Sequence, residues 1–173
     1  MRIVQGIAMM GALLSLAAAT GADEMAMPTM KPNAAFDEIK ALAGTWDGQM
    51  PDGKSVKATY QVVSNGSCVM ETLDPPDHGI MITMYRVEGG RLVMDHYCSM
   101  NNVPHMRGAR SADGKEIDFA FINASNMASP KDVHMHGLKL AFVDHDHLNH
   151  EWALYAQGKA QAPVVFHLTR SSS

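Results

Sequence analysis

The chain has 173 residues, of which 46% are hydrophobic and 18% are charged, and this length suits one domain. The composition excludes an intrinsically disordered chain, which would be polar and rich in charge. The formal net charge of −4 excludes a general nucleic-acid-binding protein, because neutralising phosphates requires a basic surface.

Residues 1–22 have the layout of a secretory signal peptide. Arg2 precedes an apolar stretch from Ile7 to Ala19, and we expect cleavage after Ala19 or Ala22. An uncleaved membrane anchor is the alternative, but the apolar stretch is shorter than the roughly 20 residues that span a bilayer. No cysteine lies near the expected cleavage position, which argues against a lipid anchor. The sequence therefore predicts a periplasmic or secreted protein with no stable membrane anchor.

Residues 23–33 contain two prolines and no periodicity, and we expect a flexible leader. Met25, Met27 and Met30 could bind Cu(I) through their thioethers, although incidental methionines are the simpler interpretation. The remaining residues, 34–173, show neither an internal repeat nor a linker, so they are expected to form one domain.

One helix and a series of strands are predicted in this domain. Asn33 is a suitable N-cap for a helix from Ala34 to Ala43, which Gly44 would end. Runs typical of strands then follow, separated by turn residues. They lie near residues 45–50, 55–64, 67–73, 80–88, 91–100, 105–111, 115–122, 133–143, 147–157 and 162–170. About ten short antiparallel strands with no helices between them predict an all-β, up-and-down barrel, which can hold one small ligand.

The Gly89-Gly90 turn sets the register of one hairpin and so indicates which side chains face the barrel interior. It pairs Val87 with Leu92, Tyr85 with Met94, Thr83 with His96, and Met81 with Cys98. The more apolar face should point inward, and it carries Leu92, Met94, His96, Cys98 and Met100. On the preceding strand the same reasoning places Cys68, Met70 and Thr72 inward. The residues predicted to line a ligand cavity are Met70, Met81, Thr83, Tyr85, Met94, His96 and Cys98.

Two cysteines in an exported protein raise the question of a disulfide. In the predicted register Cys68 is level with Tyr85, four residues along the strand direction from Cys98 and one strand away. Their Cα atoms should then be more than ~12 Å apart, whereas a disulfide needs roughly 4.4–6.8 Å. We therefore favour two free thiols, and a register slip of a few residues would allow the bond.

The histidines offer a possible metal site. His134 and His136 alternate on one strand, so both imidazoles reach the same face and form a usable ligand pair. His150 is expected opposite Leu140 on the next strand, away from this pair. Because zinc needs three or four ligands, solvated or core histidines are the simpler interpretation. A metal or haem carrier built on His134 and His136, or on His96, is kept as an alternative function, and no cofactor is assigned.

His96 is the most informative single residue. It is expected to lie inward beside Thr83, as a hydrogen-bonded core histidine, a polar contact at the base of a ligand cavity, or an axial haem ligand. An enzyme that uses His96 with a neighbouring tyrosine or cysteine is a further alternative, although a binding protein is favoured. No Gly-x-Ser-x-Gly motif occurs. The carboxylates are expected on outward faces of separate strands, so no catalytic pair is predicted; they are Glu71, Asp95, Asp118 and Glu151.

Three segments resemble an uncharacterised family of exported bacterial proteins that look lipocalin-like, or calycin-type. These are residues 79–85, residues 92–98 with the His-Tyr-Cys triplet, and the run from Asn101 through Pro104 to Met106 and Arg107. An early Leu-x-Gly-x-Trp segment, residues 42–46, fits the same outline. The sequence departs from the family at Val103 and His105, where we expect a polar and a basic residue.

The resemblance implies a barrel in which Trp46 packs the closed end, and it implies no activity. With the flexible methionines of the predicted interior, the sequence predicts an exported barrel that holds a small apolar or amphipathic molecule.

Overall fold

The structure, a computed structural model, describes residues 30–172. The signal peptide predicted for residues 1–22, together with Met25 and Met27, lies outside this range. The described elements, in chain order, are α1 (Ala34–Ala41), β1 (Gly44–Gln49), β2 (Ser55–Val63), the short 3-10 helix η1 (Ser64–Gly66), β3 (Cys68–Asp74), β4 (Met81–Glu88), β5 (Arg91–Tyr97), β6 (Val103–Arg110), β7 (Glu116–Ser125), β8 (His134–Phe142), β9 (His147–Ala156), β10 (Lys159–Ala160) and β11 (Val164–Arg170).

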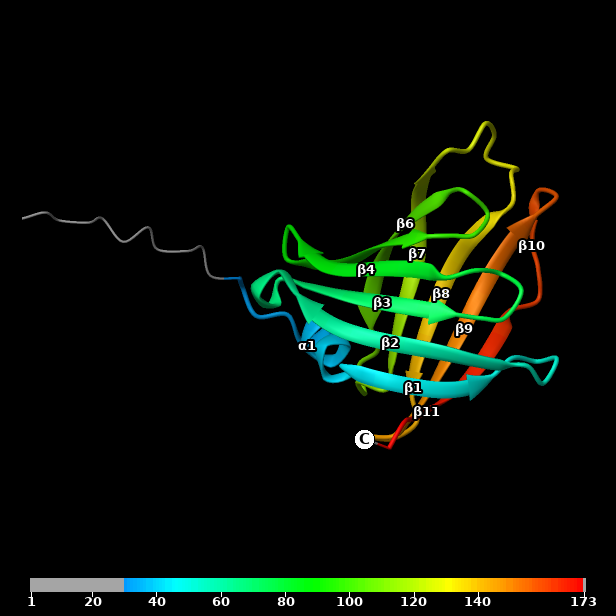
Figure 1. The fold of residues 1–173 in the computed structure, drawn as a ribbon. Helices are drawn as coiled ribbons and strands as arrows, with labels where there is room; N and C mark the ends of the chain where they lie inside the picture. The colour runs from blue at the N-terminus through cyan, green and yellow to red at the C-terminus, as the bar shows by residue number, and fades with distance from the viewer. Residues whose placement is uncertain (1–29, 173) are drawn as a thin grey trace, which may run out of the picture.

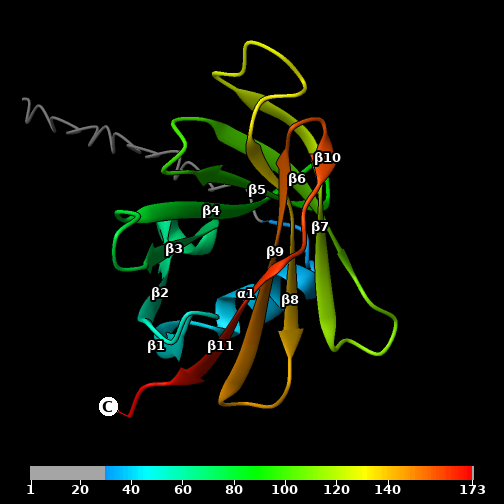
Figure 2. The same cartoon turned by 90° about the vertical axis from the view of Figure 1, so that its right-hand side faces the viewer.

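In residues 30–172 ten antiparallel strands close into an up-and-down barrel, as predicted (Figures 1 and 2). Each strand from β1 to β8 pairs with the next strand in the chain, and β11 closes the barrel by pairing with both β9 and β1. The two-residue β10 only extends β9. In this described part of the chain, closure leaves no long sheet edge unpaired. Within the same residues, no helix is long and apolar enough to cross a membrane.

Helix α1 covers the end of the barrel where β1 begins (Figure 1). The Asn33 side chain caps it by accepting a hydrogen bond from the backbone N–H of Phe36 at 3.0 Å, as predicted. Phe36 and Ile39 are buried on the face that packs on the barrel. Trp46 is buried at the same end and donates from Nε1 to the Leu42 carbonyl at 2.9 Å. The helix ends two residues before the predicted Ala43, and this end of the barrel is closed.

Arg170, at the end of β11, joins the closing strand to this helix. Its guanidinium lies 4.2 Å from the centre of the Trp46 ring. It also donates to the carbonyls of Ala41 and Ala43, at 3.2 and 3.0 Å. The last carbonyls of a helix lack partners within the helix and carry its negative dipole end, so a cation stabilises them.

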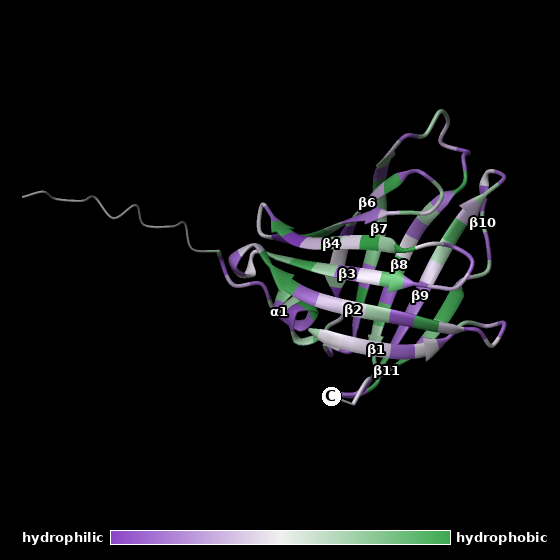
Figure 3. Ribbon diagram, viewed as in Figure 1, coloured by the Kyte–Doolittle hydropathy of each residue, from purple (hydrophilic) through white to green (hydrophobic). Residues whose placement is uncertain are grey.

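The register of the β4–β5 hairpin is the predicted one, with Tyr85 opposite Met94 and Thr83 opposite His96. Figure 3 shows hydrophobic and hydrophilic residues alternating along the strands, as expected when one face of each strand points into the barrel. The positions around Tyr85 and His96 therefore lie inside the barrel, and both residues are buried.

The predicted face of β3 is wrong. Cys68 pairs with Arg86, and Val69 rather than Cys68 is opposite Tyr85. A shift of one residue exchanges the two faces of a strand. The buried residues of β3 are therefore Val69, Glu71 and Leu73, and the residues predicted inward, Cys68, Met70 and Thr72, are on the opposite face.

Both cysteines of the described chain are free thiols, as the sequence favoured. Cys98 is 9% exposed, and Cys68 is half-buried.

Candidate functional site

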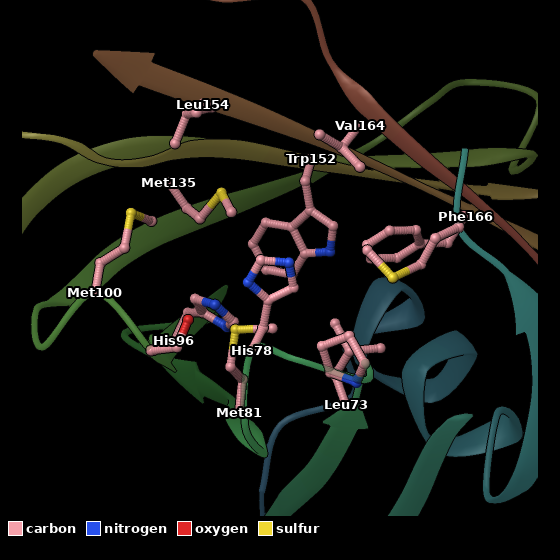
Figure 4. A pocket seen from close by; sticks show the side chains of 13 residues that line it. Leu73, His78, Met81, His96, Met100, Met135, Trp152, Leu154, Val164 and Phe166 are labelled. Carbon is pink, nitrogen blue, oxygen red and sulfur yellow. The ribbon is translucent and has the colours of Figure 1, made fainter. Parts of the chain in front are cut away.

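A cavity of about 320 Å³ lies inside the barrel at the end opposite α1 (Figure 4). Its walls are mostly apolar. They include residues of β4 together with residues of β9 and β11, the strands at which the barrel closes. The lining residues are Met50, Leu73, Pro75, His78, Met81, His96, Ser99, Met100, Met135, Trp152, Leu154, Val164 and Phe166. Strand alternation positions them: on β9, for example, Trp152 and Leu154 are two residues apart and both face the cavity.

The rings of His96 and Trp152 form part of this apolar wall. Their ring centres are 4.4 Å apart, and both side chains are almost completely buried. His96 Nδ1 is hydrogen-bonded to Thr83 Oγ1 at 2.9 Å. In the described part of the chain, neither His96 Nε2 nor Trp152 Nε1 has a hydrogen-bond partner. Burial lowers the pKa of His96 to about 4, so its imidazole is neutral at pH 7.

Four further side chains form a buried polar cluster, consisting of Tyr60, Glu71, Tyr85 and His150. Tyr85 donates its hydroxyl to Glu71 Oε2 at 2.5 Å, and the Tyr60 hydroxyl contacts His150 Nε2 at 2.7 Å. All four are buried, and Glu71 and His150 are fully enclosed. Glu71 comes from β3, directly opposite Thr83. Thr83 therefore lies between this cluster and His96, which lines the cavity.

Burial sets the ionisation of this cluster. Desolvation raises the pKa of Glu71 from 4.5 to about 7, although hydrogen bonds from Tyr85 and Thr83 lower it in part. Desolvation also lowers the pKa of His150 from 6.5 to about 3. The barrel interior thus holds an acid that titrates near neutral pH next to a base that stays neutral.

The structure brings only some of the predicted lining residues to the cavity. Met81 and His96 line the cavity. Thr83 does not line it, but its hydroxyl is hydrogen-bonded to His96. Tyr85 and Met94 are completely buried in the barrel interior without lining the cavity.

Two other predicted lining residues lie elsewhere. Cys98 is buried beside the lining residue Ser99. Met70 was placed in the cavity from the wrong face of β3 and lies on the strand's other face, because β3 is shifted by one residue.

Sequence reasoning missed Trp152 and Glu71. The alternation of Leu148, His150, Trp152 and Leu154 was available in the sequence and marks one face of β9. The sequence does not show that β9 pairs with β11. This pairing brings the face of β9 to the same cavity as β4 and β5. Glu71 was expected on an outward face, and that prediction is wrong because the strand is shifted.

The histidine pair of β8 lies outside the cavity lining. His134 Nδ1 donates to the Asp132 carbonyl at 2.7 Å, and His134 Nε2 is 2.9 Å from His136 Nδ1. The rings of Phe121 and Tyr155 pack against both imidazoles. Across residues 30–172, no group of three or more His, Cys, Asp or Glu side chains is arranged to hold a metal ion.

The fold and the cavity together define a class, a small closed barrel with an apolar cavity at one end. No family model matches the chain, and no curated protein matches its sequence. Among solved structures, Rv2717c from Mycobacterium tuberculosis is similar, with 17% identity and a TM-score of 0.57 over 83% of this chain and 100% of that chain.

A protein of unknown function from the DUF3598 family of Nostoc punctiforme is also similar. It has 11% identity and a TM-score of 0.52 over 77% of this chain and 49% of that chain, so this chain spans about half of that protein's length. At these identities the likeness shows the barrel fold alone. The likeness is to uncharacterised barrel proteins, and the lipocalin-like relationship and the His-Tyr-Cys signature stay predictions.

Proposed function

We propose that the protein binds a small, largely apolar molecule in the cavity of the barrel. One observation carries the proposal: the barrel leaves a cavity of about 320 Å³ whose walls are almost entirely apolar. An apolar molecule that fills the cavity removes its own surface and that of the walls from water, which favours binding.

The cavity walls support a compact ligand. A volume of about 320 Å³ is near the lower end of the ~300–1,000 Å³ that ligand pockets usually have. Methionines from four separate segments contribute to the walls, and their flexible side chains adapt to irregular apolar shapes. They are Met50, Met81, Met100 and Met135. Export, proposed from residues 1–22, would expose the site to molecules outside the cytoplasm.

Native mass spectrometry of the full chain, purified without an affinity tag, tests the proposal. We expect a mass excess that disappears when the same sample is denatured, and its value identifies the class of molecule. The alternatives, an enzyme based on His96 and a metal or haem carrier, stay predictions, and a metal or haem mass in this measurement would favour the carrier.

A pair of substitutions locates the binding. Val164→Phe adds a phenyl group inside the cavity, whereas Val143→Phe adds one at a position that is 60% exposed and outside the lining. The mass excess should disappear in Val164→Phe and persist in Val143→Phe. Equal retention in both variants would place the ligand elsewhere and contradict the proposal.

A further inference from the structure

The polar side chains of the cavity wall are sorted by depth. Among the described lining residues, four carry a side-chain nitrogen or oxygen atom: His78, His96, Ser99 and Trp152. His96 and Trp152 are almost completely buried, whereas His78 and Ser99 are exposed. Every other lining side chain is apolar and is buried or half-buried. His78 and Ser99 therefore mark the entrance, where the cavity meets solvent.

The buried pair offers a ligand no polar contact. His96 Nδ1 is already hydrogen-bonded to Thr83 Oγ1 at 2.9 Å. Within residues 30–172, His96 Nε2 and Trp152 Nε1 have no partner, but neighbouring atoms cover both of them and leave almost no accessible surface. A polar group that reached this depth would lose its hydrogen bonds to water and gain none from the wall. The deep part of the cavity therefore accepts only apolar groups.

The connection between β3 and β4 carries His78 to the entrance. Asp77 and Gly79, on either side of it, have φ values of 71° and 72°, and such left-handed conformations bend the chain sharply. Lys54 Nζ contacts Asp77 Oδ2 at 2.7 Å, which ties this connection to the turn between β1 and β2. Figure 4 shows the His78 imidazole among the lining side chains. A neutral imidazole has one donor and one acceptor nitrogen, so His78 can pair with a polar group of either kind.

Ser99, on the connection between β5 and β6, adds a hydroxyl that can donate or accept at the same entrance. We infer that the ligand is a monopolar amphiphile, an apolar chain or ring with one polar head, and that it binds with its head outward at His78 and Ser99. A molecule that is polar at both ends must bury one end without a partner. The inference rests on the proposed function, and it makes His78 the residue that recognises the head of the ligand.

The orientation is measured directly with 1-octanol bound to the ¹³C-labelled full chain. We expect nuclear Overhauser effects between the terminal methyl group of the alcohol and the ring of Trp152, which lies deep in the cavity. The methylene group next to the hydroxyl should give such effects with the ring of His78. Reversed contacts, or equal contacts of both ends with Trp152, would overturn the inference.

Titration calorimetry tests the role of His78 with 1-octanol and with cyclohexane, which has no head. His78→Ala should weaken the binding of 1-octanol about fivefold and leave that of cyclohexane unchanged, because only the alcohol loses a hydrogen bond. His78→Gln keeps a donor and an acceptor and should restore most of the affinity. His145→Ala, at a histidine that is 84% exposed and outside this lining, is the control. An equal loss for both probes in His78→Ala would contradict the inference, because it would show only packing.

A third probe, 1,8-octanediol, has a hydroxyl at each end of the same chain. It should bind at least about tenfold more weakly than 1-octanol, because its second hydroxyl is buried without a partner. Equal affinities would overturn the inference. If 1-octanol does not bind, or binds head inward, while the native measurement shows a mass excess, the inference fails and the proposed function survives. If neither binding nor a mass excess is found, both fail.

Discussion

Glu71 Oε1 and His150 Nδ1 lie 3.6 Å apart inside the barrel, and neither has a hydrogen-bond partner in the described structure. At this separation the two atoms are too far apart for a hydrogen bond, so burial leaves both of them unpaired. Because burial favours the uncharged form of each residue, Glu71 is a neutral carboxyl below pH 7 and His150 is a neutral imidazole. The pair therefore makes the stability of the barrel sensitive to pH.

Glu71→Gln should remove one component of this pH dependence. The pKa of Glu71 is about 7 in the folded chain and about 4.5 in the unfolded chain, so the native state binds more protons between these values. Wild-type stability is thus lost as pH rises from about 4.5 through 7, by on the order of 3 kcal/mol. The free energy of unfolding of Glu71→Gln, relative to wild type, should increase by this amount from pH 4.5 to 8 in urea titrations. A difference independent of pH would show that Glu71 is ionised and solvated. Glu116→Gln, at a side chain that is 41% exposed, is the control.

Trp152 should report the protonation of His96. Trp46→Phe leaves Trp152 as the only tryptophan, 4.4 Å from the His96 ring. Protonated imidazole quenches a neighbouring indole, and the pKa of His96 is lowered to about 4 by burial. Fluorescence should therefore stay constant from pH 7 to about 5 and fall near pH 4, while far-UV circular dichroism confirms that the chain is folded. A midpoint near pH 6.5 would mean that His96 is solvated. His96→Gln in the same background should remove the transition.

The two thiols should react separately. With no disulfide between them, denatured protein alkylated without reductant should carry two labels. In the folded protein the half-buried Cys68 should react at least about tenfold faster than Cys98, which is 9% exposed and needs local opening. Iodoacetamide labelling followed by intact mass measures both rates, and Cys68→Ser isolates the slower one. An unlabelled chain two hydrogens lighter would reveal a disulfide.

Arg170→Ala should destabilise the barrel through its closed end. The substitution removes two hydrogen bonds to the carbonyls that end α1 and a cation–π contact with Trp46. We expect a loss of about 2 kcal/mol in urea denaturation, because charge-assisted hydrogen bonds are stronger than neutral ones. Lys57→Ala, which breaks an exposed ion pair with Asp47, should change stability little. Equal effects of the two substitutions would contradict a structural role for Arg170.

The barrel and one hairpin were predictable from the sequence, because tight turns fix register locally. The Gly89-Gly90 turn allows one register for the two strands that it joins, and this register places His96 opposite Thr83. Between β3 and β4 the connection runs from Pro75 to Ile80, and a connection of that length sets no register. The alternation on β3 did not decide the face either, since Cys68 and Met70 are as apolar as Val69 and Leu73. The hydrogen bond that makes burial of Glu71 acceptable comes from Tyr85, which is fourteen residues away in the chain.

The candidate site was only partly predictable for a related reason. Residues of β4 and β5, such as Met81 and His96, were found because they belong to one hairpin. Trp152 and Phe166 reach the same cavity only because the barrel closes between β9, β11 and β1. Closure of the barrel brings together residues that are far apart in the sequence, and no local sequence pattern predicts that they are close.

The contacts of Arg170 with Trp46 and with the carbonyls at the end of α1 also affect how the chain folds during synthesis. Arg170 and Ala43 are 127 residues apart in the chain, so synthesis must pass almost the whole domain before they can meet. Until then the edges of β1 and β9 stay unpaired and open to other strands. Pairing at such sequence separation is slow, because the entropy of closing a long loop is lost first. Nascent chains held in this open-edged state would be the form most exposed to aggregation.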